Sequence, residues 1–220
     1  MIGLEVGELR VSIQSVEVLR GINLSVASGE MIGLVGRNGA GKTTTLRAVM
    51  GLVAPRSGHI RFAGEDLTRL PTHRRAALGI GYMPEDRRLV PQLSVEENIL
   101  LPGWVTRGVD AAARLAFVYD LMPEVAAMRE RKALLLSGGQ QKLVALARAL
   151  TVGTRLLLLD EPFEGVAPAL SQRLAEVIAA LKGKDLAILI AQSDLNHSVK
   201  LLDRDYLIER GANSARAAVV

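Results

Sequence analysis

Residues 36–43 read GRNGAGKT, which is the pattern G-x-x-x-x-G-K-[ST] of a phosphate-binding loop. The apolar run Met31–Val35 precedes this loop, and the apolar residues within 44–50 recur at helical spacing. Gly51 and then Pro55 follow, as a helix end requires. The sequence therefore predicts a strand, a phosphate loop and a helix that ends near residue 51.

Each residue type in this loop suits the binding of phosphate. Glycines let successive backbone N–H groups turn toward phosphate oxygens, and the helix that follows offers its positive end. Lys42 is expected to reach the terminal phosphates, and the Thr43 hydroxyl to bind Mg²⁺. A chance match in a chain of this length has odds of roughly one in a hundred. The expected nucleotide-binding residues are Gly36, Arg37, Asn38, Gly39, Ala40, Gly41, Lys42, Thr43 and Thr44.

Four leucines, Leu156–Leu159, run directly into two acids, Asp160 and Glu161. A buried strand explains the leucines, but carboxylates seldom lie at the end of a buried element unless they are paired or bind a ligand. We expect Asp160 to hold Mg²⁺ through its water shell and Glu161 to orient and polarise the attacking water. The alternative is a strand that turns into solvent, and the phosphate loop in the same chain argues against it.

A third motif, SGGQ at residues 137–140, opens a helix whose apolar residues share one face. Two glycines at a helix start make an anion site, although a flexible loop with a glycine cap is the alternative. One chain with one phosphate loop hardly needs a second phosphate site. We therefore expect Ser137, Gly138, Gly139 and Gln140 to serve a nucleotide that another chain holds.

The rest of the chain suggests one α/β domain with a helical insertion. The apolar runs 155–159 and 186–191 are separated by a helical pattern at 174–181, which predicts a βαβ unit in a parallel sheet. Residues 95–136 are rich in alanine and leucine and predict helices. The first 25 or so residues alternate apolar and polar side chains, which favours an antiparallel sheet.

The composition excludes several classes of function. The chain has 220 residues, of which 49% are hydrophobic, and no cysteine, so disulfides and thiol catalysis are excluded. Its charge of +4 is scattered and aromatics make up only 3%, which argues against nucleic acid as a partner. The start carries Glu5 and Glu8 in place of a basic segment, so we expect no signal peptide. The apolar runs are too short to span a membrane.

The three motifs GRNGAGKT, LSGGQ and LLLLDE, in this order, resemble the nucleotide-binding domain of ABC transporters. The resemblance implies an α/β fold: a RecA-like P-loop NTPase core with a mainly parallel sheet, an N-terminal antiparallel β subdomain and an inserted helical subdomain. It implies a single domain over 1–220, with 1–90 and 137–220 as core and about 91–136 as helical subdomain. It also implies ATP and Mg²⁺ as cofactors. It further implies a head-to-tail dimer in which ATP lies between the phosphate loop of one chain and the LSGGQ motif of the other.

Two further stretches, GIGYMPEDRRLVPQLSVEENIL (79–100) and DEPFEGVAP (160–168), are similar to the ATPase subunits of branched-chain amino acid importers. This similarity implies a peripheral protein on the cytoplasmic face of the inner membrane. Its partners would be a second ABC ATPase subunit, identical or different, membrane permease subunits and, indirectly, a periplasmic or surface solute-binding protein. Urea and amide importers share much of the pattern.

The chain departs from the superfamily at several positions. Glu85 occupies the position where most members have a glutamine that reaches the magnesium. Gln192 occupies the position after the last core strand where most members have a histidine, called the switch histidine. The resemblance thus implies Thr43, Asp160 and Glu85 as metal ligands and Glu161 and Gln192 as catalytic residues.

The position of the adenine-stacking aromatic holds Ile13, which implies weaker ATP affinity. His197 falls a turn into the next helix and is expected to pack or face solvent. A regulatory or weakly active partner of a second ATPase is therefore an alternative function. ABC ATPases of DNA repair or translation carry additional domains that do not fit this length. The permease contact is expected near Arg87–Trp104, where Trp104 is either an exposed anchor or part of the core.

Overall fold

Strand β3 (Met31–Val35) lies inside a six-stranded sheet with the order β10-β9-β3-β8-β7-β6. The computed structural model describes residues 2–194 and 200–215. Strands β9, β3, β8, β7 and β6 pair in parallel, and β10 is antiparallel to β9, which confirms the mainly parallel sheet. The bounds of the other strands are Ile80–Met83 for β6, Leu156–Asp160 for β7, Ala187–Gln192 for β8, Arg204–Glu209 for β9 and Ala212–Ala215 for β10.

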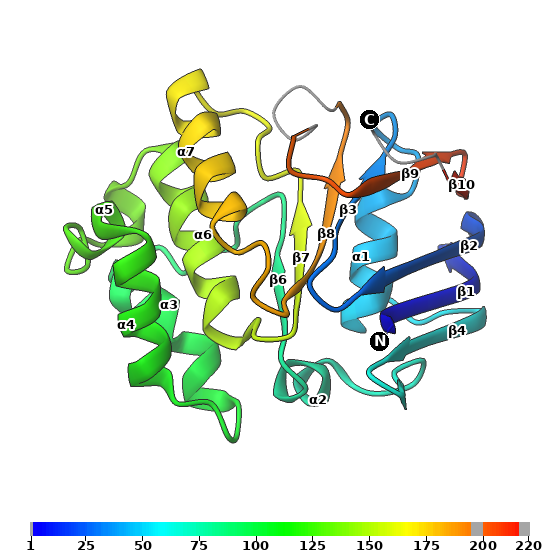
Figure 1. The fold of residues 1–220 in the computed structure, drawn as a ribbon, viewed down its shortest axis with the longest axis horizontal. Coiled ribbons are helices and arrows are strands. Elements are labelled where there is room, and N and C mark those ends of the chain that lie inside the picture. Colours follow the sequence, from blue (N-terminus) through cyan, green and yellow to red (C-terminus); the bar gives the residue numbers. More distant parts are fainter. Residues whose placement is uncertain (1, 195–199, 216–220) are drawn as a thin grey trace.

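The side chains of each parallel strand alternate between two apolar layers. In β7, Leu157 and Leu159 pack with α6 (Gly138–Val152) and α7 (Pro168–Ala179), whereas Leu156 and Leu158 face the layer that contains α1 (Lys42–Met50). All four leucines are fully buried. A strand buried on both faces must be apolar throughout, which explains the unbroken run. Figure 1 shows α6 and α7 on one side of this sheet and α1 on the other.

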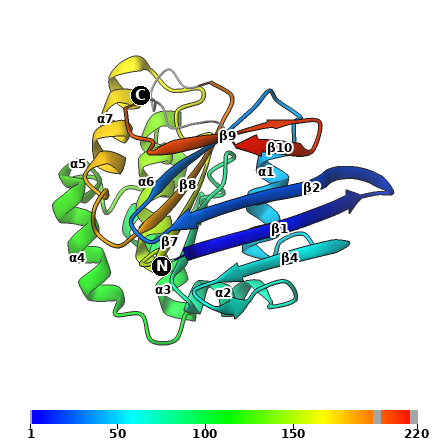
Figure 2. The same cartoon turned by 45° about the vertical axis from the view of Figure 1, so that its right-hand side comes forward.

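A second, antiparallel sheet has the order β2-β1-β4-β5. Its long hairpin joins β1 (Ile2–Ile13) to β2 (Val16–Ala27) through Gln14 and Ser15, whose φ angles of 47° and 69° suit a two-residue turn of type I′. Its other strands are β4 (Ser57–Phe62) and β5 (Glu65–Asp66). The hairpin confirms the predicted N-terminal antiparallel sheet, which lies beside α1 (Figure 2).

The predicted helical stretch contains α3 (Val95–Val105), α4 (Ala111–Leu121), α5 (Pro123–Ala126) and the 3₁₀ turn Ala133–Leu135. Ser94 caps α3 by accepting a hydrogen bond from the Glu97 amide, and the Glu97 carboxylate accepts one from the Ser94 amide. Helices α3, α4 and α5 all contact α6, which joins this insertion to the core. None of the helices in the described ranges has the length and apolar character needed to span a bilayer.

The sequence patterns missed several short elements. Strands β4, β5, β6, β9 and β10 and helix α2 (Thr72–Ala77) were not predicted. Helix α7 begins at Pro168, six residues before the predicted apolar pattern, because proline fits the first turn of a helix. Strand β7 extends to Asp160, which pairs with Ala191 of β8. The acid is therefore the last residue of the strand itself.

Candidate nucleotide site

The phosphate loop connects the end of β3 to the start of α1. Gly39 and Gly41 have φ angles of 80° and 115°, a region that side chains strongly disfavour. Gly36 is required for a different reason: a Cβ there would lie 2.2 Å from the Ile208 carbonyl oxygen of β9. Gly41, the residue before α1, provides no side-chain cap. The loop thus meets the requirements of an anion site at a helix N-terminus.

Lys42, at the start of α1, is almost entirely buried. Its Nζ atom donates hydrogen bonds to the Gly36 carbonyl at 2.6 Å and to the Arg37 carbonyl at 3.3 Å. It also lies 3.1 Å from Glu161 Oε1, in an ion pair between two buried side chains. A buried ammonium group needs such partners, because its desolvation is otherwise costly. Lys42 therefore bridges the phosphate loop and the acid that follows β7.

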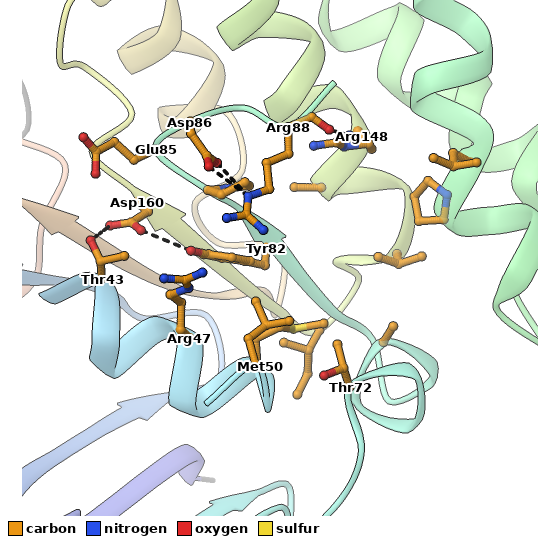
Figure 3. A pocket seen from close by; sticks show the side chains of 18 of the residues that line it. Thr43, Arg47, Met50, Thr72, Tyr82, Glu85, Asp86, Arg88, Arg148 and Asp160 are labelled. Atoms are coloured by element: carbon orange, nitrogen blue, oxygen red, sulfur yellow. Dashed lines mark hydrogen bonds and ion pairs between the residues drawn. The ribbon is translucent and has the colours of Figure 1, made fainter. Parts of the chain in front are cut away.

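Asp160 is fully buried and receives one hydrogen bond on each carboxylate oxygen. Thr43 Oγ1 donates to Oδ1 at 3.0 Å, and the Tyr82 hydroxyl donates to Oδ2 at 3.1 Å (Figure 3). Burial raises the pKa of Asp160 to about 6, although the hydrogen bonds from Thr43 and Tyr82 oppose this rise. A hydroxyl and a carboxylate held this close are hard oxygen donors of the kind that Mg²⁺ prefers. Thr43 and Asp160 therefore fit a magnesium ion.

Glu161 has a φ angle of 47°, which is unusual for a residue other than glycine. Its backbone is held on both sides: its N–H donates to the Ala191 carbonyl at 2.9 Å, and its carbonyl accepts from Lys142 Nζ at 2.6 Å. Lys142 is itself buried, which lowers its pKa. These contacts hold Glu161 in a sparsely populated conformation, as residues at functional sites often are.

Gln192 and Glu85 lie near the two acids at the end of β7, because Gln192 lines a cavity with Glu161 and Glu85 lines another with Asp160. Gln192 is the last residue of β8, is buried, and accepts a hydrogen bond from the Gly36 amide on its carbonyl oxygen at 3.2 Å. Glu85 is exposed and lines a cavity of about 620 Å³ together with Thr43 and Asp160 (Figure 3). In the described part of the chain, no three His, Cys, Asp or Glu side chains are grouped as a metal site. Thr43, Asp160 and Glu85 line the same cavity, so a magnesium ion held there would have two carboxylates and one hydroxyl within its reach.

The SGGQ motif forms the N-terminus of α6. The Ser137 hydroxyl accepts from the Gln140 amide at 3.3 Å, and the Gln140 side chain accepts from the Ser137 amide at 3.0 Å. Gly139 has no room for a side chain, because a Cβ would lie 2.0 Å from Leu170. Ser137 and Gly138 are exposed. Since α6 and α1 cover opposite faces of the sheet, the two candidate phosphate sites are carried by helices that the sheet separates (Figure 1).

Three residues of this site were missed by the sequence analysis: Tyr82, Lys142 and Ser193. Tyr82 lies on the short strand β6, which has no clear pattern. A lysine next to the apolar run Leu143–Leu146 was a signal for Lys142, which the structure shows to be 1% exposed. Ser193 directly follows Gln192 and hydrogen-bonds to the Glu161 carboxylate. Its position after a core strand was the available signal.

Other predicted positions lie outside this cluster. Ile13, at the end of β1, is 41% exposed. Trp104 is 57% exposed near the end of α3, so the alternative that it packs in the core is wrong. His197 lies outside the described residues.

Comparison with known proteins places these features in one family. The profile of the ABC transporter family matches residues 19–164. The high-affinity branched-chain amino acid transport ATP-binding protein BraG of Pseudomonas aeruginosa is 36% identical over 196 residues, 89% of this chain and 84% of that protein. The lipopolysaccharide export system ATP-binding protein LptB of Escherichia coli K12 is 35% identical over 196 residues, 88% of this chain and 81% of that protein.

Solved structures agree in fold. A dimeric bacterial ABC transporter cassette superimposes with a TM-score of 0.88 at 21% identity and covers 99% of both chains. An ATP-binding subunit of an ABC transporter superimposes with a TM-score of 0.85 at 28% identity, over 98% of this chain and 90% of that chain. The fold is therefore that of an ATP-binding cassette, with the phosphate loop, Asp160 and Glu161 at one site. The chain belongs to the ABC transporter family and is an ATP-binding ATPase subunit.

Proposed function

We propose that this ATPase energises the import of branched-chain amino acids from the cytoplasmic face of the membrane. It would act in a dimer with an identical or a second ABC ATPase, beneath permease subunits that receive solute from a binding protein. The observation that carries the ATPase chemistry is the contact between Lys42 and Glu161, which joins the phosphate loop to the acid after β7. Asp160 and Thr43 lie beside it, 3.0 Å apart.

The residues of the phosphate loop would bind the nucleotide. Lys42 would exchange its carbonyl partners for the terminal phosphates, since a phosphate oxygen is the stronger acceptor. The N–H groups at the start of α1 would face the same phosphates. Thr43 and Asp160, with Glu85 nearby, would hold Mg²⁺. When bound, Mg²⁺ neutralises charge on the β- and γ-phosphate oxygens.

Glu161 would act on the attacking water. Its carboxylate would accept a proton while the water oxygen bonds to the γ-phosphorus and the bond to the β-phosphate oxygen breaks. Gln192, at the end of β8, has an amide that can donate a hydrogen bond to the γ-phosphate but cannot carry charge. Rate depends on the Glu161 carboxylate being close and correctly oriented.

A second chain would complete each site. The N-terminus of α6 is exposed or half-exposed and lies on the face of the sheet opposite α1. It consists of Ser137, Gly138, Gly139 and Gln140. A head-to-tail pair of chains would bring this start to the partner's nucleotide. The solved cassette with the same fold is dimeric, which supports a pair of chains.

The substitution Glu161→Gln tests the catalytic role. It keeps the size of the side chain but removes the base, so ATP turnover should fall by about 10²- to 10⁴-fold while ATP still binds. Glu130→Gln is a suitable control, because the Glu130 side chain is 86% exposed. Turnover of the Glu161→Gln variant at the parental rate would show that another group acts as the base.

The solute is proposed from BraG and from the stretches 79–100 and 160–168. LptB is almost equally similar to this chain, so export of lipopolysaccharide is the competing outcome. Uptake of labelled leucine, isoleucine and urea should be measured in cells that lack the chain and in cells that carry Glu161→Gln. Loss of leucine and isoleucine uptake supports the proposal. Normal uptake with loss of surface lipopolysaccharide, or loss of urea uptake alone, would reject it.

A regulatory subunit with little activity of its own is the second candidate. The observation that favours it is Gln192, which occupies the end of β8 and cannot take a proton. ATPase activity of the purified chain, alone and mixed with its second ATPase subunit, separates the two candidates. Rapid hydrolysis by the chain alone would exclude the regulatory role.

A further inference from the structure

Ser193, directly after β8, contacts three residues of the nucleotide site. Its amide N–H donates to Glu161 Oε2 at 3.1 Å, and its hydroxyl donates to Glu161 Oε1 at 2.7 Å. The same hydroxyl oxygen lies 2.7 Å from Asn38 Oδ1 and accepts from Lys42 Nζ at 3.3 Å. Ser193 therefore contacts both oxygens of the Glu161 carboxylate and two side chains of the phosphate loop.

Two donors from one residue fix the plane of a carboxylate better than one. The last torsion of a glutamate side chain is broad, so a single hydrogen bond leaves the carboxylate free to rotate. A serine hydroxyl carries one proton, and the charged Glu161 is a stronger acceptor than the Asn38 amide. The hydroxyl and the N–H of Ser193 thus hold the two oxygens of Glu161 at once.

The backbone of Glu161 is fixed by other groups. Ala191 accepts its N–H, and Lys142 donates to its carbonyl. Within the described residues, the carboxylate also contacts the Lys42 ammonium, at 3.1 Å. Lys42 is the residue that must turn to the phosphates when a nucleotide binds. Ser193 is then the partner that stays with Glu161, because a phosphate attracts a neutral hydroxyl less strongly than it attracts the Lys42 ammonium.

We propose that Ser193 is a positioning residue for hydrolysis. Its hydroxyl holds the Glu161 carboxylate in the orientation that accepts a proton from the attacking water, and its oxygen lies 2.7 Å from Asn38 Oδ1, beside the phosphate loop. This role rests on the role proposed for Glu161 as the base. Ser193 itself touches neither the water nor the phosphates in this scheme.

Four variants of the purified chain test the role: Ser193→Ala, Ser193→Val, Ser193→Thr and, as an unrelated control, Ser214→Ala on β10. Val and Thr have nearly the same shape, but only Thr keeps the hydroxyl. Loss of the hydroxyl in Ala and Val should lower kcat by about 10- to 100-fold, because a small misplacement of a catalytic group is costly. The KM for ATP should change by less than about twofold. Thr should return kcat to within about threefold of the parent.

A double-mutant cycle separates a positioning role from a merely structural one. If Ser193 acts through Glu161, Ser193→Ala should cause no further loss in the Glu161→Gln background. Equal melting temperatures of the Val and Thr variants would show that a difference in kcat does not come from folding. The proposal would be overturned if Ser193→Ala and Ser193→Val both had the parental kcat. It would also be overturned if Ser193→Thr were as slow as Ser193→Val. If Glu161→Gln itself hydrolyses ATP at the parental rate, the proposed function fails instead.

Discussion

The hydroxyl of Tyr82 lies 3.1 Å from Asp160 Oδ2, so a side chain from β6 binds the acid at the end of the neighbouring strand β7. Burial of Tyr82 and the nearby Asp160 charge both raise the pKa of the tyrosine, so it remains a hydrogen-bond donor. Thr43 occupies the other oxygen of Asp160. The Asp160 carboxylate is therefore oriented before any ion binds, and Tyr82 donates one of the two hydrogen bonds that orient it.

Tyr82→Phe should weaken the binding of Mg²⁺ by about tenfold, since groups that orient metal ligands typically affect metal affinity by 10- to 100-fold. The measurement is the electron paramagnetic resonance signal of free Mn²⁺, titrated with protein and ATP. Tyr119→Phe is the matched control, because the Tyr119 hydroxyl donates to the Glu96 carboxylate at 2.8 Å in the helical insertion. Each variant should lose about 1 kcal/mol of stability. Equal Mn²⁺ affinities in the two variants would contradict the role of Tyr82.

The ligand-free protein should become less stable as Asp160 ionises. Its folded pKa of about 6 lies above the ordinary value of 3.8, so the contribution of this group to stability is fully present below about pH 3.8 and is lost as the pH rises through 6. Asp160→Asn removes this dependence. Urea titrations with a chelator present measure the free energy of unfolding. As the pH rises from 3.8 to 8, this free energy should increase in the variant by roughly 3 kcal/mol relative to the parent. A difference that stays constant with pH would contradict the expected ionisation.

Arg75 is 2% exposed, and its described hydrogen bonds all go to backbone carbonyl groups. Its guanidinium donates to Ala48 and Val49 at the C-terminal end of α1, at 2.9 and 2.7 Å, and to Leu70 at 2.7 Å. Arg75→Met should cost about 3 kcal/mol in unfolding free energy, because these carbonyls lose a charged donor.

Arg75→Lys should recover little of this loss. A lysine ammonium group cannot reproduce the planar arrangement of N–H donors of the arginine guanidinium. Chemical denaturation of both variants checks the expectation. If Arg75→Lys were as stable as the parent, positive charge alone would stabilise the end of α1, and the planar geometry of the guanidinium would not matter.

Much of the fold could be predicted where local signals are strong. The strand at Met31–Val35 has the predicted bounds, because a continuous apolar run meets a glycine-rich loop. The helix that follows it ends at Met50 with Gly51 in a left-handed conformation, as predicted. Strands such as β6, with only four residues, could not be recognised, because their burial comes from neighbours that are distant in sequence.

The contacts around the site could not be predicted for the same reason. Tyr82 reaches Asp160 only because β6 pairs with β7, and Ser193 reaches Asn38 only because β8 lies between β7 and β3. Strand order depends on which crossovers pack best, and no local pattern records it. The sequence could therefore identify candidate residues for nucleotide binding, but not the side chains that hydrogen-bond to those candidates.

Ile13 offers a way to test where the adenine base lies. It ends β1, pairs with Val16 across the hairpin turn and is 41% exposed, so an aliphatic side chain stands at the position where the resemblance implies an aromatic ring. Ile13→Tyr should add base stacking of about 1–3 kcal/mol. The affinity for ATP should rise by about 5- to 150-fold, measured by calorimetry in the Glu161→Gln background to avoid turnover. Ser12→Tyr is the matched control, because adjacent residues of a strand face opposite sides. An Ile13→Tyr variant with unchanged affinity, or a Ser12→Tyr variant with the same gain, would place the adenine away from this end of the hairpin.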